Sequence, residues 1–486
     1  MAGIGKSTEE WIRLVLDVSF GDLPKEVVTH TIDYIIDHIG NVISGCNSSV
    51  GQALIKFAKD EGGNPEATIL GTGMRTSCTM AAMVNAKIGN THDNDDVFLT
   101  RMHIGTIPFC AALSAAEKVR ASGKDVILAT VLGYDICARC GLAVPLVEIT
   151  PEKEVIYPAV VGYSFNVFGA AVSAAKLVGL NREQMRNALS LAAYFAPLPL
   201  AGLWRRRAPH NVCKYADLGW ITKVGVTAAL LAQNDYPGDE AILDADDFWK
   251  ACGVSSFKHS VFLEDLGRKW HITESSIKPY PCCRQFNSSI DMLTKIMKQN
   301  TLRPDDIDSI KIKVPPLLLN PEYIWNKVQR WDSVEPKDYT SSEFSFPYNM
   351  ACAAFGIPPG PEWHTSERMH DPQLVEFGKK IVLEKNPVST ETAEFMLGYQ
   401  GPPGAFRKRF PVTIEVRVGE RVFVESSDYA RGDSWDPHYR LTHEEIKEKF
   451  RVNVSGFLSP HRTETVLNRI EKIEDVKDIT EITGLL

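Results

Sequence analysis

The chain has 486 residues, of which 44% are hydrophobic and 23% charged, and its formal net charge is −8. This length exceeds what one compact core usually holds, so two domains are expected. Lys and Arg are scattered along the chain, which with the negative net charge argues against nucleic acid or an anionic membrane as a partner. A small anionic substrate stays compatible with this composition, because net charge does not reveal a local cationic pocket.

The N-terminal segment lacks the apolar core and cleavage site of a signal peptide, and no run reaches the roughly 18 apolar residues of a membrane span. Ten cysteines are too few for a disulfide scaffold. Several stand in apolar helical surroundings, where a reduced cysteine behaves as a small hydrophobic residue: Cys46, Cys110, Cys137 and Cys352. We therefore expect a cytoplasmic protein with reduced cysteines.

Up to about residue 270 the sequence predicts helix after helix. Segments rich in Ala, Val and Leu end at helix-stop residues such as Gly123 and Gly179. The clearest are residues 79–92, 107–122, 125–143, 167–178, 182–194 and 219–233. So much alanine and glycine favours closely packed helices, several of them buried on all sides.

The pattern changes near residue 273. Residues 309–314 and 411–418 alternate apolar and polar side chains, as half-buried strands do. Gly419 and Glu420 separate the second strand from residues 421–425, which predicts a β-hairpin. Further on, the helical pattern resumes with a capping-box sequence that begins at Thr442.

These patterns predict a mainly α fold made of a large all-helical domain and an inserted α+β domain. Residues 1–272 would form the first part of the helical domain and residues 273–430 the inserted domain. Residues 431–486 would return to the helical domain.

A metal site is only weakly suggested by the cysteines. Cys137 and Cys140 have the spacing of a zinc knuckle, but no second pair stands at a matching distance. Packing inside an apolar helix explains them better. An iron–sulfur cluster that adds Cys282 or Cys283 has similarly little support. We therefore expect neither a metal nor a cofactor.

The polar run His-Asp-Asn-Asp-Asp at residues 92–96 is harder to explain structurally. Acidic residues disfavour the C-terminal end of a helix, where this run stands. A calcium loop is excluded because Phe98 and Ile104 stand where glycine and glutamate are required. With His103 just beyond, a functional site is favoured, while a solvated surface loop stays open as the alternative.

From this run onward the chain resembles the MmgE/PrpD family. The Asp-rich block of the family matches residues 93–98, and the most specific match is Lys-Pro-Tyr-Pro-Cys-Cys-Arg at residues 278–284. Further matches follow in order over nearly the whole chain, at residues 103–105, 108–113, 168–179, 214–220, 344–348 and 429–432.

The resemblance implies a helical domain that carries a lid, usually as a homodimer, with the active site between the two. It also implies lyase or isomerase chemistry on a small carboxylic acid without a metal or other cofactor. The candidate catalytic residues that match the family position by position are Asp93, Asp96, His103, Lys214, Lys278 and Tyr348.

The residue types fit this chemistry independently. Removal of water or CO₂ beside a carboxylate requires a group that moves a proton and fixed positive charge against the dianion that develops. We predict that His103 moves the proton, oriented by Asp93 and Asp96, and that Lys278 and Lys214 bind carboxylate. Crowding of like charges is expected to lower a lysine pKa toward that of a usable base.

Other candidates would bind the substrate. Tyr348 would donate a hydrogen bond to it, and Arg284 closes the 278–284 motif. Arg206, within three consecutive arginines, and His210 could form a carboxylate clamp, although a solvated loop explains this run equally well.

The chain also departs from the family. Val97, Phe98, Val160, Asp217 and Asn287 stand where the family commonly has a threonine or histidine, or a motif that contains one. Several histidines are therefore missing, so neither the substrate nor the reaction need be that of other members.

Three functions stay open. The first is a cofactor-independent lyase, either a dehydratase/hydratase or a decarboxylase, that acts on a small di- or tricarboxylic acid. The second is an epimerase or isomerase with Lys278 and His103 as bases on opposite faces of one carbon. The third is an inactive family member that binds without turnover, which the missing histidines suggest.

Overall fold

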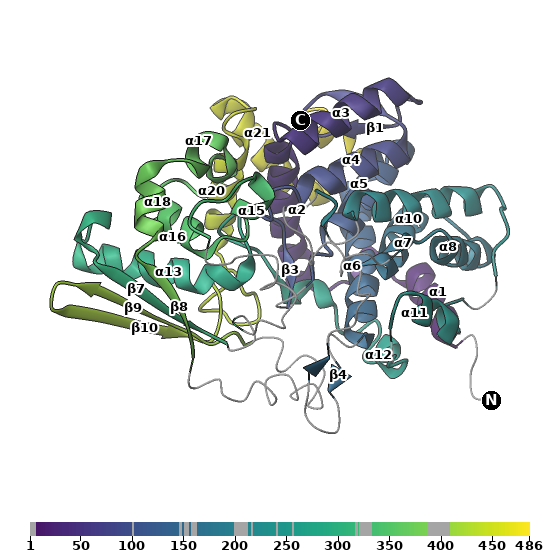
Figure 1. The fold of residues 1–486 in the computed structure, drawn as a ribbon. Helices are drawn as coiled ribbons and strands as arrows, with labels where there is room; N and C mark the ends of the chain where they lie inside the picture. Colours follow the sequence, from purple (N-terminus) through teal and green to yellow (C-terminus); the bar gives the residue numbers. More distant parts are fainter. Residues whose placement is uncertain are drawn as a thin grey trace.

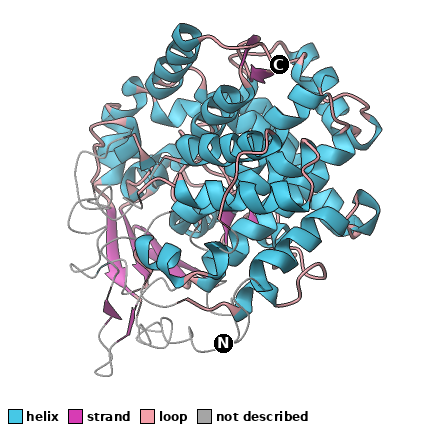
Figure 2. Cartoon of the chain, turned by 90° about the vertical axis from the view of Figure 1, so that its right-hand side faces the viewer, coloured by secondary structure: helices cyan, strands magenta, loops and turns pink. Residues whose placement is uncertain are grey.

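The structure is a computed structural model that describes most of the chain. The described residues are 6–99, 102–144, 148–149, 155–156, 163–198, 212–214, 217–239, 242–254, 257–315, 319, 333–386 and 409–486. Helices dominate, and the longer strands gather at one side of the molecule (Figures 1 and 2). The predicted mainly α fold with a small strand-containing part is confirmed.

The first part of the chain is helical, as predicted. It contains α1 (Lys6–Asp17), α2 (Lys25–Gly45), α3 (Ser49–Glu61), α4 (Cys78–Gly89), α5 (Thr106–Val119), α6 (Gly123–Ala143), α7 (Val167–Leu177), α8 (Arg182–Tyr194), α10 (Leu218–Gln233), α11 (Asp246–Ala251) and α12 (Ser260–Leu263). Each of the six segments predicted to be helical forms a helix, from α4 to α10.

The helices pack closely because small residues stand where they meet. A Cβ atom added to Gly133 of α6 would lie 2.6 Å from the carbonyl oxygen of Gly169 in α7, too close for any other residue. Cys137 and Cys140 are free, buried side chains of α6, as the packing interpretation predicts. Helix α6 is long and apolar enough to cross a membrane, but the molecule buries all of its apolar window.

The lid combines helices with a four-stranded sheet. The strands are β7 (Ser309–Val314), β8 (Ile381–Lys385), β9 (Val412–Val418) and β10 (Arg421–Ser427), in the order β10-β9-β7-β8. The helices are α13 (Arg284–Asn300), α15 (Tyr339–Ser342), α16 (Phe346–Ala354), α17 (Ser366–Met369) and α18 (Pro372–Gly378). The β9–β10 hairpin confirms the prediction, whereas the parallel partner β8 had no alternating pattern to reveal it.

Two separate hydrophobic cores follow this division. One joins the first 277 residues with residues from 441 onward and with Phe344 of the lid, and the other lies within the lid. Helices α20 (His443–Val454) and α21 (Pro460–Glu471) pack on α2, and α22 (Thr480–Thr483) follows them. The predicted capping box at Thr442 is present, with Glu445 as its partner.

The chain enters and leaves the lid along two neighbouring segments, residues 275–278 and 430–434, which we call the crossing segments. Ile277 donates its backbone N–H to the carbonyl of Gly432 over 3.1 Å. The Ser276 hydroxyl donates to Asp433 over 2.6 Å. On its other side, β6 (Ser275–Ser276) pairs with β3 (Val97–Phe98), so the segment before Lys278 is fixed to the helical domain.

We expect Gly432→Ala to destabilise the protein by roughly 3 kcal/mol, because φ is 97° there and the new Cβ would overlap the carbonyl oxygen of Ile277. Denaturant unfolding of the variant measures this loss. Gly419→Ala is the matched control: φ is 57° but nothing lies within 4 Å of the added Cβ, so only about 1 kcal/mol should be lost. Equal losses in both variants would contradict close contact between the crossing segments.

Candidate active site

The polar run at residues 92–96 forms a tight turn after α4. Asp93 adopts φ of 49°, a left-handed conformation that aspartate tolerates better than most residues and that often marks a functional site. All five side chains of the run are buried, with at most 7% exposed. Lys449 of α20 stabilises the turn, because its Nζ donates a hydrogen bond to the carbonyl of Asn94 over 2.8 Å. The surface-loop alternative is therefore wrong.

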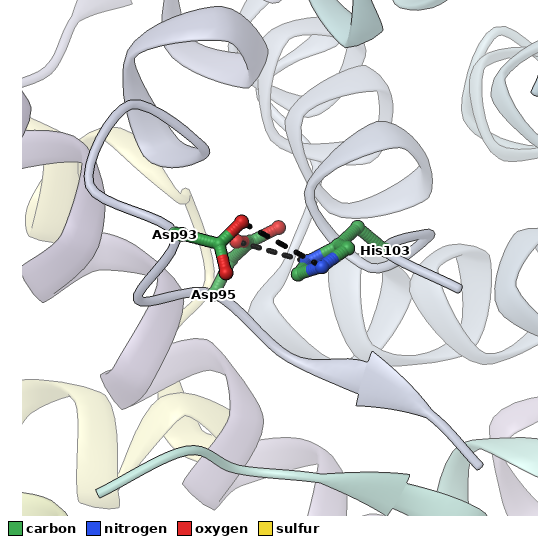
Figure 3. Close-up of side chains that lie close together, drawn as sticks. All are labelled: Asp93, Asp95 and His103. Atoms are coloured by element: carbon green, nitrogen blue, oxygen red, sulfur yellow. Dashed lines mark hydrogen bonds and ion pairs between the residues drawn. The ribbon is translucent and has the colours of Figure 1, made fainter. Parts of the chain in front are cut away.

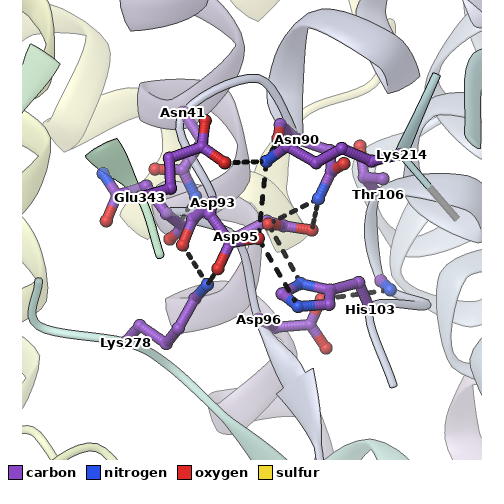
Figure 4. A network of polar contacts seen from close by, with 12 residues as sticks. Asn41, Asn90, Asp93, Asp95, Asp96, His103, Thr106, Lys214, Lys278 and Glu343 are labelled. Atoms are coloured by element: carbon purple, nitrogen blue, oxygen red, sulfur yellow. Dashed lines mark hydrogen bonds and ion pairs between the residues drawn. The ribbon is translucent and has the colours of Figure 1, made fainter. Parts of the chain in front are cut away.

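Two lysines and a histidine converge on Asp93. Lys278 Nζ lies 2.9 Å from Asp93 Oδ2, and Lys214 Nζ lies 3.4 Å from Asp93 Oδ1. His103 Nε2 is 3.7 Å from the same Oδ1. Four of the six candidate catalytic residues thus meet at the boundary between helical domain and lid (Figure 4).

Asp95 holds the second ring nitrogen of His103. The distance from His103 Nδ1 to Asp95 Oδ1 is 3.2 Å (Figure 3). Both oxygens of Asp95 also accept from the side-chain amide of Asn90 at 2.9 Å. Sequence reasoning missed Asp95, although it stands within the same run and alternates with Asp93.

Asp96 belongs to an adjacent network instead. It accepts hydrogen bonds from Tyr134 Oη at 2.9 Å, Ser275 Oγ at 2.7 Å and the backbone N–H of Gly105 at 3.0 Å. His38 Nε2 lies 3.4 Å from it. The expectation that Asp96 orients His103 is corrected: Asp96 anchors the start of α5 and β6, the elements that carry the site.

The charges of the site stabilise one another. Burial alone would raise the pKa of Asp93, but Lys278 and Lys214 outweigh it and hold that pKa below its ordinary range. Burial would also raise the pKa of Asp95, but the contact with His103 outweighs it and lowers that pKa. These carboxyls are therefore ionised at neutral pH.

The predicted lowering of a lysine pKa is wrong. Burial does act in that direction on Lys278, but the carboxylates of Asp93 and Asp95 outweigh it and raise the pKa. Burial would also lower the pKa of Lys214, but the carboxylates of Glu343 and Asp93 outweigh it and raise that pKa. The lysines face carboxylates rather than each other, so both are fixed cations and poor bases.

The other candidates lie away from Asp93 or outside the described residues. Tyr348 donates its hydroxyl to the carbonyl of Trp363 inside the lid core. Arg284 forms a two-bond ion pair with Asp433 of the crossing segment, which leaves one Nη atom without a partner among the described residues. Arg206 and His210 lie outside the described residues. Substrate binding by these four residues stays a prediction.

The lid brings further polar groups that the sequence did not reveal. Glu343, which follows α15, forms an ion pair with Lys214. His364 stacks on His92 across the domain boundary, with ring centroids 5.3 Å apart. Burial and the charge of Lys214 lower the pKa of His92 to about 3, so this ring is neutral. Glu343 directly precedes a family motif, whereas His364 stands in an irregular stretch without a recognisable pattern.

Three of the residues that replace family histidines have structural roles. Asp217 caps the start of α10 by accepting from the N–H of Trp220. Phe98 packs edge-on against Tyr134. Asn287 is fully buried in α13, where the thiol of Cys282 donates to its side-chain oxygen over 3.7 Å. Val160 lies outside the described residues.

A cation could in principle lie among Asp93, Asp95 and His103, whose ligand atoms all fall within 4.8 Å of one another. However, the ammonium groups of Lys278 and Lys214 lie 2.9 Å and 3.4 Å from the oxygens of Asp93. Their positive charges would repel such an ion. The donor set fits two lysines better than it fits a metal.

The sequence profile of the MmgE/PrpD N-terminal domain matches residues 10–260, and that of the MmgE/PrpD C-terminal domain matches residues 280–475. The chain belongs to the MmgE/PrpD family. The boundary between the two matched regions contains the first crossing segment and Lys278, where the helical domain meets the lid.

Several relatives of this chain are named cis-aconitate decarboxylases. The protein from Mus musculus is 26% identical over 505 residues, which cover 99% of this chain and 93% of its own. The protein from Homo sapiens is 24% identical over 500 residues, with 99% and 94% covered. A protein from Aspergillus terreus is 23% identical over 308 residues, 60% of each chain. These similarities support a lyase of the MmgE/PrpD type.

Proposed function

We propose that the protein is a cofactor-independent lyase that removes CO₂ or water beside a carboxylate of a small di- or tricarboxylic acid. The observation that carries the proposal is the convergence of two buried ammonium groups and His103 on Asp93. Buried, fixed cations stabilise a developing dianion far more strongly than solvated ones do. The names of the relatives make decarboxylation of cis-aconitate the first reaction to test.

In a decarboxylation, the bond between a carbon and its carboxylate breaks and CO₂ leaves without the bonding electron pair. That pair spreads over the adjoining double bond toward a second carboxylate, where Lys278 and Lys214 oppose the new negative charge. A proton must then add to carbon. Because Asp95 holds Nδ1 of His103, Nε2 is the atom that delivers this proton.

A dehydration would use the same groups in a different order. A base removes the proton from the carbon next to the carboxylate, the lysines stabilise the resulting dianion, and the hydroxide leaves with a proton from an acid. His103 can exchange a proton at one of these two steps. The second proton-transfer group would then have to come from the lid or from the substrate itself.

A two-base epimerase is less well supported. It would require Lys278 to lose its proton, whereas the carboxylates around Lys278 raise its pKa. A lysine that stays charged binds an anion but does not abstract a proton from carbon.

Incubation with cis-aconitate in D₂O separates the three open functions. A decarboxylase is expected to release CO₂ and to place one deuterium on carbon in the product, which NMR detects. Deuterium exchange into recovered acid, without CO₂ or a new alkene, would favour the epimerase. If a panel of related di- and tricarboxylates shows neither of these changes and neither loses nor gains water, the protein is a binding protein and the proposed function is wrong.

A further inference from the structure

Glu343 is a buried carboxyl group that the lid places in the site. It follows α15, and its side chain is 0% exposed. Its backbone carbonyl accepts the N–H of Cys283, which fixes its position relative to the 278–284 motif. Among the described residues, its carboxyl oxygens contact a single cation, Lys214, and no other donor.

The same Lys214 is needed for substrate under the proposed function, yet all three of its donor positions are in use. Its Nζ donates to the carbonyl of Asn90 at 3.0 Å, contacts Asp93 at 3.4 Å and pairs with Glu343. A substrate carboxylate must therefore displace a partner. Asp93 is also held by Lys278 and His103, so Glu343 is the group that can give way.

Two ionised carboxylates on one buried ammonium group would repel each other strongly. A protonated Glu343 removes this repulsion, because the neutral acid no longer competes for Lys214. Its O–H group can also donate a charge-assisted hydrogen bond to the substrate.

The surroundings of Glu343 favour this neutral form. Lys214 and Lys278 lower its pKa and Asp93 raises it, but burial is the largest influence, and the net effect is a pKa well above the ordinary value of a glutamate. Tyr339 of α15 also interacts electrostatically with Glu343. When Glu343 is neutral, Lys214 still faces the carboxylate of Asp93, whose Oδ1 lies 3.4 Å from its Nζ.

We propose that Glu343 is a substrate-binding residue that acts as a neutral carboxylic acid, leaving Lys214 to the substrate carboxylate and donating its own hydrogen bond to it. This inference rests on the proposed function and names the partner of Lys214 in the bound state. A carboxyl with a raised pKa is neutral below that pKa and ionised above it. Carboxylate binding is therefore strong at lower pH and weakens as the pH rises through the pKa of Glu343.

The test compares wild type with Glu343→Gln, whose amide is neutral at every pH and similar in shape. The probe is propane-1,2,3-tricarboxylate, which has no double bond and cannot follow the decarboxylation above. Calorimetry measures its Kd over the whole pH range in which wild type stays folded. In wild type, Kd should rise by up to about tenfold per pH unit above the Glu343 pKa. In Glu343→Gln this rise should be absent, so that the variant binds more tightly than wild type at the highest pH.

Parallel pH profiles of wild type and Glu343→Gln would overturn the proposal. Glu117→Gln is the matched control, because Glu117 is equally buried but bonds to Thr68, Arg75 and Thr483. This variant should keep the wild-type profile. If Glu343→Gln fails to fold, calorimetry of wild type in two buffers decides: above the Glu343 pKa one proton should be taken up per probe bound, and no uptake at any pH would contradict the role.

A different result would affect the proposed function instead. If wild type binds no probe at any pH, or if Lys278→Met binds it as tightly as wild type does, the site does not hold a carboxylate. In that case the proposed function fails, whatever Glu343 does. If Lys278→Met loses binding while Glu343→Gln changes nothing, only the role of Glu343 fails.

Discussion

We expect His103→Asn to lower kcat/KM by about 10²- to 10⁴-fold, the range typical for removal of a positioned acid–base group. Asparagine can still donate a hydrogen bond to Asp95, but it cannot carry a proton to or from carbon. Steady-state kinetics with the acid identified in D₂O measure the loss. Binding of that acid should change much less, because the two lysines stay in place.

His271→Asn is the matched control for this variant. His271 is also buried and also pairs through Nδ1 with a carboxylate, Glu274, at 2.9 Å. It lies outside the Asp93 cluster, so its replacement should leave kcat/KM within about threefold of wild type. Comparable losses in both histidine variants would mean that His103 acts only through stability.

We expect Lys278→Met to lower kcat/KM at least about 10²-fold, equivalent to about 2.7 kcal/mol of transition-state stabilisation. Methionine keeps most of the length and apolar character of the lysine chain but removes the cation that faces Asp93. Kinetics under the same conditions measure the effect. Activity within about threefold of wild type would contradict both the assignment and the lyase mechanism built on it.

The stability of Lys278→Met needs its own control. The structure pairs Lys278 with Asp93 at full burial, so the substitution is also expected to reduce stability. Loss of one partner of a buried ion pair costs about 3–5 kcal/mol when nothing else compensates the remaining charge, and Lys214 compensates part of it. The double variant Asp93→Asn/Lys278→Met removes both charges. It should regain stability without regaining activity, which separates catalysis from folding.

The sequence revealed the parts of this protein that have a periodic pattern or a recognisable motif. The helices from α4 to α10 and the β9–β10 hairpin follow from spacing of apolar residues, because each pattern repeats over several turns or residue pairs. Asp93, His103, Lys214 and Lys278 stand in motifs that match the family. That these four side chains lie next to one another could be seen only in the folded structure.

What the sequence did not reveal depends on geometry between distant segments. The left-handed backbone of Asp93 decides that Asp95, rather than Asp96, reaches His103. Glu343 reaches Lys214 only because the lid folds over the helical domain. The direction of the lysine pKa shifts depends on which charges surround each ammonium group in the folded protein. The sequence alone does not show which charges these are.

The crossing segments have a consequence for how such enzymes diversify. Because Ile277 and Gly432 meet, everything between them enters and leaves through one point. An inserted domain joined in this way can be exchanged as one unit between relatives, provided that its contacts with the helical domain are kept. Asp93, His103 and Lys214 would remain, while Lys278, Glu343 and His364 would arrive with the incoming sequence. Under the proposed function, acceptance of a new acid would then change with the lid, while His103 would stay with the helical domain.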